Sequence, residues 1–148
     1  MNSRLQLLMR APWERIFPLA ADVERWPQIL PHYRYVRPVP DPGGERRFAM
    51  GARRGAIPVS WEAVQRPRPE GRTIEFVHTG GVTKGMWVAW NFEPVERGTE
   101  VSIEHRLDLA WPIIGDFTAR HIIGPQFIEA IAGRTLRRIR HLVEAADR

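Results

Sequence analysis

Cysteine is absent from the 148 residues of this sequence. Its absence excludes a disulfide framework, a thiol nucleophile and a thiolate metal site. It also fits a reducing compartment, so we expect a cytoplasmic location.

Long apolar runs are lacking as well. The first residues form no signal-peptide hydrophobic region, because Arg4 and Arg10 bracket only residues 5–9. The longest weakly polar stretch, LDLAWPIIG, is too short to span a bilayer and contains a proline. We therefore expect a soluble protein without stable membrane insertion.

Lysine is nearly missing. The chain has 22 basic and 17 acidic residues, and Lys84 is the one basic residue that is not arginine. The net charge of +5 comes from arginines that are scattered among acidic residues and form no block. We therefore do not expect nucleic acid as a partner.

Signatures of several enzyme classes are also missing. The sequence holds no phosphate loop and no dinucleotide fingerprint. Ser60 and Ser102 lie in no nucleophile elbow. No pair of histidines or carboxylates has metal-ligand spacing. We expect neither a metal nor a cofactor.

What is present is a series of short strands followed by a helix. The length suits one domain over residues 1–148, with a core of its own. Turn residues separate runs typical of strands, and their short connections favour antiparallel neighbours. These runs are 3–10, 33–39, 46–53, 57–65, 72–79, 84–94 and 99–109.

Helical patterns flank these strands. Pro12 suits a first helical turn, and Asp22 is a candidate N-cap for a second short helix over 23–30. From Asp116 to Ala146 apolar residues recur at helical spacing, with a break at Gly124-Pro125 that predicts a kink or a long helix starting near Pro125. This order predicts an α+β fold, in which a bent antiparallel sheet of about seven strands surrounds the C-terminal helix.

Three segments carry a resemblance to a known family. They are APWERIFPLAADVERWPQILPHY, WNFEPVERGTEV and IGPQFIEAIAGRTLRRIRHLVE. In order and spacing they resemble the START/Bet v 1-like (SRPBCC) superfamily with its helix-grip fold. More narrowly they resemble the polyketide cyclase/dehydrase and lipid-transport group, which includes coenzyme Q-binding proteins. The resemblance implies an apolar cavity between the sheet and the C-terminal helix.

Aromatic and apolar residues on the expected inner face are candidates for the cavity wall. Because strand side chains alternate, Trp90 shares its face with Met86, Val88 and Phe92. Ordinary core packing is the competing interpretation, since here the cavity wall is the core. The expected ligand-binding residues are Trp26, Leu30, Tyr33, Trp61, Phe76, His78, Val88, Trp90, Phe92, Ile103, His105, Phe117, His121 and Ile128.

Three histidines interrupt apolar faces. They are His78, His105 and His121. A buried neutral imidazole can donate or accept a hydrogen bond, or move a proton. A core histidine satisfied by a backbone partner is the competing interpretation.

The resemblance to aromatase/cyclases also points to a catalytic set. Tyr33 lies at about the spacing of the family's pocket tyrosine, and Gln65 lies where the family has an arginine. Glutamine cannot supply positive charge to an enolate, and this departs from the cyclase pattern. Tyr33, Gln65 and His105 are the catalytic candidates.

Three functions remain open. The leading hypothesis is binding of a small hydrophobic molecule, such as a lipid, an isoprenoid quinone or a polyketide-like aromatic, as a carrier or shield. The alternative is a polyketide aromatase/cyclase or dehydratase that uses the same cavity. The third is a ribosome-associated interaction protein, as described for some coenzyme Q-binding relatives. The sequence leaves both a monomer and a homodimer open.

Overall fold

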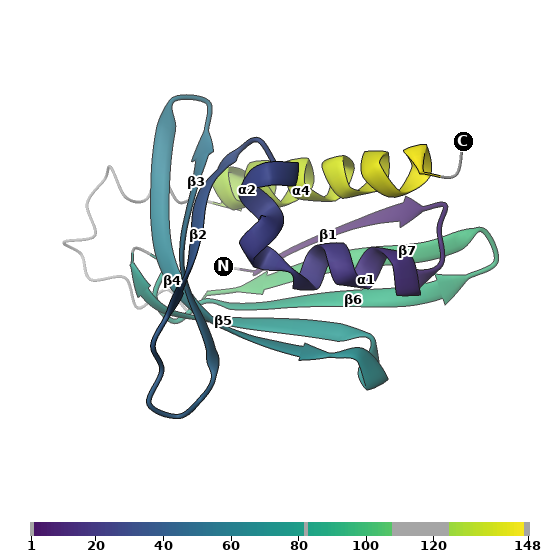
Figure 1. Ribbon diagram of the computed structural model, residues 1–148. Helices are drawn as coiled ribbons and strands as arrows, with labels where there is room; N and C mark the ends of the chain where they lie inside the picture. Colours follow the sequence, from purple (N-terminus) through teal and green to yellow (C-terminus); the bar gives the residue numbers. More distant parts are fainter. Residues whose placement is uncertain (1, 82, 108–124, 147–148) are drawn as a thin grey trace.

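The computed structural model describes residues 2–81, 83–107 and 125–146. Within these residues a seven-stranded antiparallel sheet curves around helix α4, and Figure 1 shows all the α-helices on its concave side. The strands are β1 (Asn2–Met9), β2 (Tyr33–Val39), β3 (Arg46–Arg54), β4 (Ile57–Arg68), β5 (Thr73–Gly81), β6 (Trp87–Val95) and β7 (Gly98–Arg106). The helices are α1 (Trp13–Ala21), η1 (Val23–Arg25), α2 (Trp26–Ile29), η2 (Pro69–Gly71) and α4 (Pro125–Ala145).

The sheet order follows from hairpins between consecutive strands. From edge to edge the order is β1-β7-β6-β5-β4-β3-β2, so β1 closes the sheet beside the last strand. Leu5 of β1 lies opposite Ile103 of β7. The predicted α+β helix-grip fold is confirmed, and the predicted strands differ from the observed ones by a few residues at their ends.

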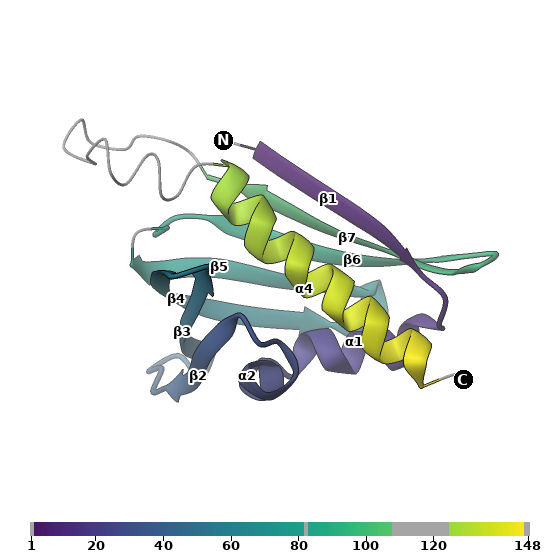
Figure 2. The ribbon, with the colours of Figure 1, turned by 90° about the horizontal axis from the view of Figure 1, so that it is seen from above.

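Helix α4 crosses the concave face of the sheet diagonally, as seen from above in Figure 2. Its buried residues recur every three or four positions, which gives the helix one apolar stripe. They are Phe127, Ile128, Ala132, Thr135, Leu136, Ile139 and Val143. The helix begins at Pro125, as predicted, and the rest of the predicted helical stretch lies outside the described residues.

The short helices after β1 bring Trp26 and Tyr33 under α4. Ile16, Phe17 and Ala20 form the buried side of α1. The predicted N-cap at Asp22 is wrong in one respect: Asp22 occupies the cap position, but its side chain makes no capping hydrogen bond. The peptide N–H of Asp22 instead donates to the carbonyl of Pro18, which ends α1.

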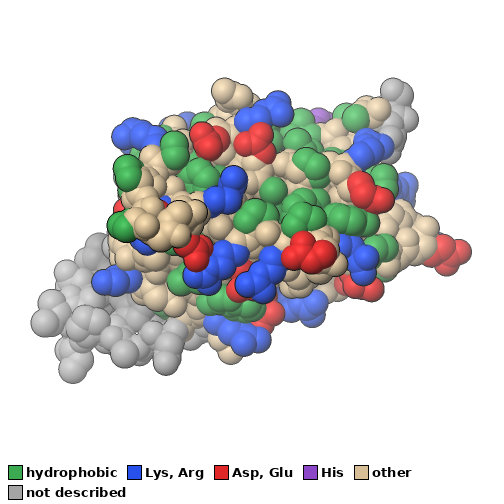
Figure 3. Space-filling view, turned by 60° about the horizontal axis from the view of Figure 1, so that its bottom comes forward, with side chains coloured by type: hydrophobic (Ala, Val, Ile, Leu, Met, Phe, Trp, Pro, Cys, Tyr) green, Lys and Arg blue, Asp and Glu red, His purple; other side chains and the backbone are tan. Residues whose placement is uncertain are grey.

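The convex face of the sheet carries charges of both signs. In Figure 3 basic and acidic side chains are interspersed over one face of the molecule, with apolar side chains between them. Arg47 contacts both Asp41 and Glu62, and Arg68 contacts Glu75. None of the described helices has the length and apolarity that crossing a membrane requires.

Candidate functional site

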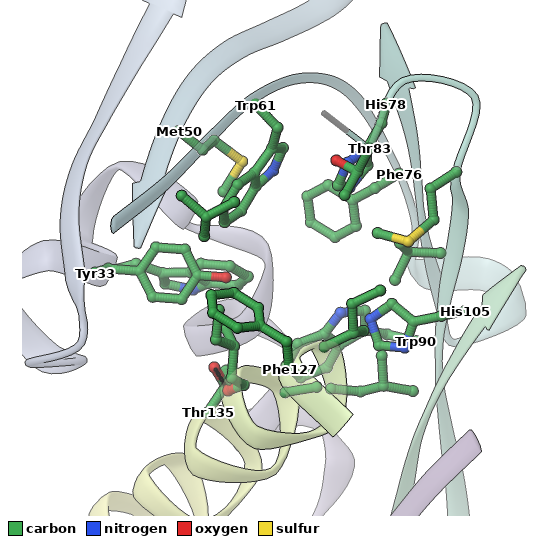
Figure 4. Close-up of a pocket in the computed structure, with 18 residues that line it drawn as sticks. Tyr33, Met50, Trp61, Phe76, His78, Thr83, Trp90, His105, Phe127 and Thr135 are labelled. Atoms are coloured by element: carbon green, nitrogen blue, oxygen red, sulfur yellow. Dashed lines mark hydrogen bonds between the residues drawn. The ribbon is translucent and has the colours of Figure 1, made fainter. Parts of the chain in front are cut away.

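A cavity lies between the inner face of the sheet and the first half of α4. Its volume is about 90 Å³. Figure 4 shows side chains from β3 to β7, from α4 and from the start of β2 converging on one space. The described wall consists of Trp26, Tyr33, Met50, Val59, Trp61, Phe76, His78, Thr83, Met86, Val88, Trp90, Ile103, His105, Phe127, Ile128, Ile131, Ala132 and Thr135.

Strand alternation brings the sheet residues of this wall together. In β6, Val88 and Trp90 point inward and are buried. Ile103 and His105 lie opposite Trp90 and Val88 on β7, so these four side chains form one patch of the wall. The indole of Trp87, which directly precedes Val88, points outward and donates a hydrogen bond to Glu75.

Aromatic rings form the other side of the cavity. The Trp26 ring lies 4.9 Å from that of Tyr33 and 6.0 Å from that of Trp90, measured between centroids. Nε1 of Trp26 donates to the carbonyl of Leu19, 3.0 Å away, which holds the indole against α1. The rings are thus fixed by their neighbours and expose mainly carbon to the cavity.

His78 occupies one end of the wall and is tied to its neighbours. Its Nδ1 lies 2.6 Å from Oγ1 of Thr83, and its ring stacks on Trp61. Burial, together with the nearby His105, lowers the pKa of His78 to about 3. His78 is therefore a neutral ring at physiological pH.

His105 is also buried, but it has fewer hydrogen-bond partners than His78 among the described residues. Its Nδ1 is shielded from solvent and has no hydrogen-bond partner among the described residues. Burial lowers the pKa of His105 to about 4. An unpartnered polar atom in a core is uncommon.

Tyr33 and Thr135 form a second polar region, which is backed by His32. Oγ1 of Thr135 donates to the carbonyl of Ile131, and Nε2 of His32 lies 2.8 Å from the same oxygen. Since the Thr135 proton is used, Nε2 of His32 carries the proton of this contact. Nδ1 of His32 has no partner in the part of the chain that the structure describes. Burial lowers the pKa of His32 to about 4, and Arg134 adds to the effect.

Tyr33 is a protonated phenol in this environment. Burial raises the pKa of Tyr33, while a hydrogen bond with Thr135 acts in the opposite direction with a smaller effect. Its ring lies in the wall, near those of Trp26 and Trp61. Tyr33 can therefore offer a hydroxyl group to the cavity, but not a phenolate.

The described wall offers hydrogen bonds but no charge. It contains no arginine, lysine, aspartate or glutamate. Within the described residues no cluster of histidine and carboxylate side chains has the arrangement that holds a metal ion. The chemistry available is apolar contact, neutral hydrogen bonding and proton exchange with neutral imidazoles.

Most of the residues that the sequence predicts as ligand-binding lie in this wall. Their contact with a ligand stays a prediction. These residues are Trp26, Tyr33, Trp61, Phe76, His78, Val88, Trp90, Ile103, His105 and Ile128.

Three predicted site residues lie elsewhere. Gln65 is on the inner face but beneath α1, where its amide donates to the carbonyl of Ala21 and accepts from Arg46. Phe92 packs on Phe17, with 5.2 Å between ring centroids, and Leu30 is fully buried in the core outside the cavity wall. Phe117 and His121 fall outside the described residues.

Sequence reasoning missed several wall residues. Ile131 and Thr135 belong to the predicted helical stripe of α4, so the same stripe that identifies Ile128 could have identified them. Thr83 lies in the turn between β5 and β6, and no periodicity marks it. Met86 is predicted on the inner face with Trp90 but is not among the expected ligand-binding residues. The other residues missed are Met50, Val59, Phe127 and Ala132.

Comparison with known proteins agrees with this architecture. A family model described as "Polyketide cyclase / dehydrase and lipid transport" matches residues 9–122. The Streptomyces violaceoruber protein named granaticin polyketide synthase bifunctional cyclase/dehydratase is 30% identical over 112 residues, 74% of this chain and 35% of that protein. The chain thus spans about a third of this relative.

Solved structures share the fold. The Zhui aromatase/cyclase from Streptomyces sp. R1128 superposes with a TM-score of 0.85 at 16% identity, covering 100% of this chain and 96% of the other. A START superfamily protein from Mycobacterium smegmatis superposes with a TM-score of 0.68 at 15% identity, covering 99% and 97%. The fold, the cavity beneath α4 and the family match over residues 9–122 lead to one conclusion: the chain belongs to the polyketide cyclase/dehydrase and lipid transport family.

Proposed function

We propose that this protein binds a small hydrophobic molecule in the cavity beneath α4 and carries or shields it. A lipid, an isoprenoid quinone or a polyketide-like aromatic has the required chemistry. The observation that carries the proposal is the space between the sheet and α4, with a wall mostly of apolar and aromatic side chains. Such a wall stabilises a ligand by about 25 cal/mol for each Å² of apolar surface removed from water.

The volume of the cavity limits the size of the ligand that it can bind without rearrangement of the wall side chains. Its volume of about 90 Å³ is smaller than the ~300–1,000 Å³ typical of ligand pockets and suits about one aromatic ring. Met50 and Met86 lie in the wall, and unbranched methionine side chains readily repack around a guest. A larger ligand enters by displacing these side chains.

Native mass spectrometry of the purified protein tests the proposal. We expect a retained apolar molecule, which organic extraction and chromatography then identify. Ala132→Phe places a ring in the cavity and should abolish retention, whereas Ala130→Phe adds the same ring to α4 outside the described wall and should not. A protein that purifies empty and binds none of the three ligand classes when they are offered contradicts the proposal.

An enzyme is the second candidate. The observation that favours it is the presence of both Tyr33 and His105 in one cavity wall. A polyketide aromatase/cyclase or dehydratase would use such groups as acid and base on a poly-β-ketone held in a reactive geometry. Gln65 has no part in this candidate, because its amide is bound beneath α1.

Turnover of a poly-β-ketone substrate, followed by product mass spectrometry, tests the enzyme. Tyr33→Phe should leave binding of the substrate nearly unchanged and abolish turnover, because it removes only the hydroxyl oxygen. Equal turnover by the variant excludes Tyr33 as the acid. No turnover by the wild-type protein, with substrate bound, favours the carrier.

The oligomeric state and the cellular location are further proposals. Sedimentation equilibrium distinguishes the homodimer that the sequence leaves open from a monomer. Cell fractionation tests the expected cytoplasmic location.

A further inference from the structure

Folding gathers arginines that are scattered along the sequence. No aspartate or glutamate occurs in residues 25–40, 46–61 or 130–143. These stretches contain β2, β3, the start of β4 and most of α4. β2 and β3 are neighbours in the sheet, and Thr135 of α4 contacts His32, which directly precedes β2. Segments with basic but no acidic residues therefore adjoin in space.

The β3–β4 hairpin ends in an exposed tip formed by Arg53, Arg54 and Ile57, which we call the basic tip. Arg54 and Ile57 lie opposite each other across the turn. All three side chains are exposed, and Ile57, at 44%, is the most exposed large hydrophobic residue in the described part of the chain. Neither arginine forms an ion pair with a described residue.

Two further arginines lie near the basic tip. The peptide N–H of Arg53 donates to the carbonyl of His32 at 2.9 Å, and Arg34 follows His32 in β2. His32 also contacts Thr135, which comes directly after Arg134 on α4. Arg34 and Arg134 are exposed, and neither is paired with an acidic residue among those described. The surroundings of the tip are thus positively charged.

The β6–β7 hairpin provides a comparison within the same molecule. Figures 1 and 2 place it at the opposite end of the sheet from the β3–β4 hairpin. Its Val95 is 39% exposed, much like Ile57. The exposed charges beside Val95 are those of Glu93, Glu96 and Arg97, so this hairpin is mostly acidic. An exposed apolar residue therefore lies among arginines at one end and mostly among glutamates at the other.

The basic tip continues the cavity wall toward solvent. Because side chains alternate along β4, Ile57 lies on the same inner face as Val59 and Trp61, and both of these belong to the wall. A surface that receives the tip therefore lies beside one end of the cavity.

We propose that the basic tip docks this protein reversibly on an anionic lipid surface. Guanidinium groups bind lipid phosphates with paired hydrogen bonds, and Ile57 enters the boundary between headgroups and acyl chains. An acidic protein would also attract the arginines, but the exposed isoleucine between them favours lipid. Such docking requires no stable membrane insertion. It goes beyond the proposed ligand binding and does not depend on it.

Flotation of the 148-residue protein with lipid vesicles tests the docking. We expect it to bind vesicles of a roughly 7:3 mixture of phosphatidylcholine and phosphatidylglycerol, and not vesicles of phosphatidylcholine alone. Binding should fall steeply as NaCl is raised from about 50 mM to about 500 mM, because salt screens exposed charges. No binding to the mixed vesicles at low salt, or equal binding to both kinds of vesicle, overturns the proposal.

Charge reversal locates the docking surface. Arg53→Glu/Arg54→Glu should weaken binding to the mixed vesicles more than about tenfold. The control Arg4→Glu/Arg97→Glu has the same net charge, alters exposed residues away from the tip, and should stay within about threefold of the wild type. An equal loss in both variants would show that net charge acts rather than the basic tip, and would overturn the proposal.

A second pair of variants tests the apolar contact. Ile57→Ser should weaken binding about threefold or more, because less apolar surface leaves water, whereas Val95→Ser should leave it unchanged. Circular dichroism checks that each variant is folded. If Ile57→Ser binds the mixed vesicles as well as the wild type, the charges act alone, an acidic protein surface fits the basic tip better, and the assignment to lipid is overturned.

Discussion

The rings of Trp61 and His78 lie parallel in an offset stack, with 5.7 Å between their centroids and 5° between their planes. Trp61 comes from β4 and His78 from β5, so the stack joins two neighbouring strands at the cavity. Thr83 holds the imidazole by a contact of 2.6 Å to Nδ1. Protonation would place a positive charge on this buried imidazole, which is unfavourable. The stability of the folded protein should therefore depend on pH.

The free energy of unfolding should fall as the pH drops from about 6.5 to about 4. In the unfolded chain a histidine binds a proton near pH 6.5, whereas burial lowers the folded pKa of His78 to about 3 and of His105 to about 4. The unfolded state therefore binds more protons in this window, and each of these histidines removes about 1.4 kcal/mol for each pH unit. Urea unfolding at pH 7, 6 and 5 measures the effect.

His105→Leu provides the comparison for this pH dependence. The variant should lose stability less steeply on acidification, because one of the buried histidines is gone. A stability that is equal at pH 7 and pH 5 in the wild-type protein contradicts the neutral, buried state assigned to these rings.

Thr135→Val should destabilise the protein by about 1–3 kcal/mol, although it nearly preserves volume. Valine cannot bond to Nε2 of His32, and Nδ1 of the same ring already has no partner among the described residues. Thr135→Ser keeps the hydroxyl and should retain most of the stability. Urea denaturation of both variants gives the comparison, and equal stability of the valine variant argues against this polar contact.

The fold could be predicted from the sequence because two separate signals mark each strand. One is the alternation of apolar and polar residues, and the other is the turn residues at the strand ends. In β6 the alternation of side chains alone predicts which residues point inward. These are Val88, Trp90 and Phe92, and all three are buried. In β7 alternation alone would place Ser102 on the outer, solvent-facing side of the strand, yet Ser102 is buried. Its neighbours Gln6 and Asn91, on the adjacent strands, flank it on both sides.

The site was harder to predict. The alternation of side chains along a strand shows which face of the sheet a residue lies on, but it does not show how far a cavity extends along that strand. Gln65 and Trp61 share the inner face of β4, yet α1 covers Gln65 while Trp61 reaches the cavity. Phe92 is separated from the cavity in the same way, by its contact with Phe17. Where the helices cover the sheet depends on tertiary packing, which no local pattern encodes.

Phe127→Ala should enlarge the cavity and change the size of ligand that it prefers. Phe127 lies in the wall on α4 and is buried, so its truncation should cost about 3–5 kcal/mol of stability. The space it leaves should increase the affinity for naphthalene relative to toluene. Leu30→Ala, which truncates a core side chain outside the wall, should lose stability without this change in preference.

Calorimetric titration with the two hydrocarbons decides this point. An unchanged preference for toluene in Phe127→Ala would mean that the side chain of Phe127 does not limit the cavity.

Fluorescence quenching by bromobenzene tests the central claim, a ligand-binding space beneath α4, most directly. Trp26, Trp61 and Trp90 lie in the wall, so a bound bromine atom should quench their emission. The wild-type protein and Ala130→Phe should show saturable quenching, and Ala132→Phe, with its cavity filled and its fold verified by circular dichroism, should show none. Unsaturable quenching in the wild-type protein, or equal saturation in Ala132→Phe, would contradict the account.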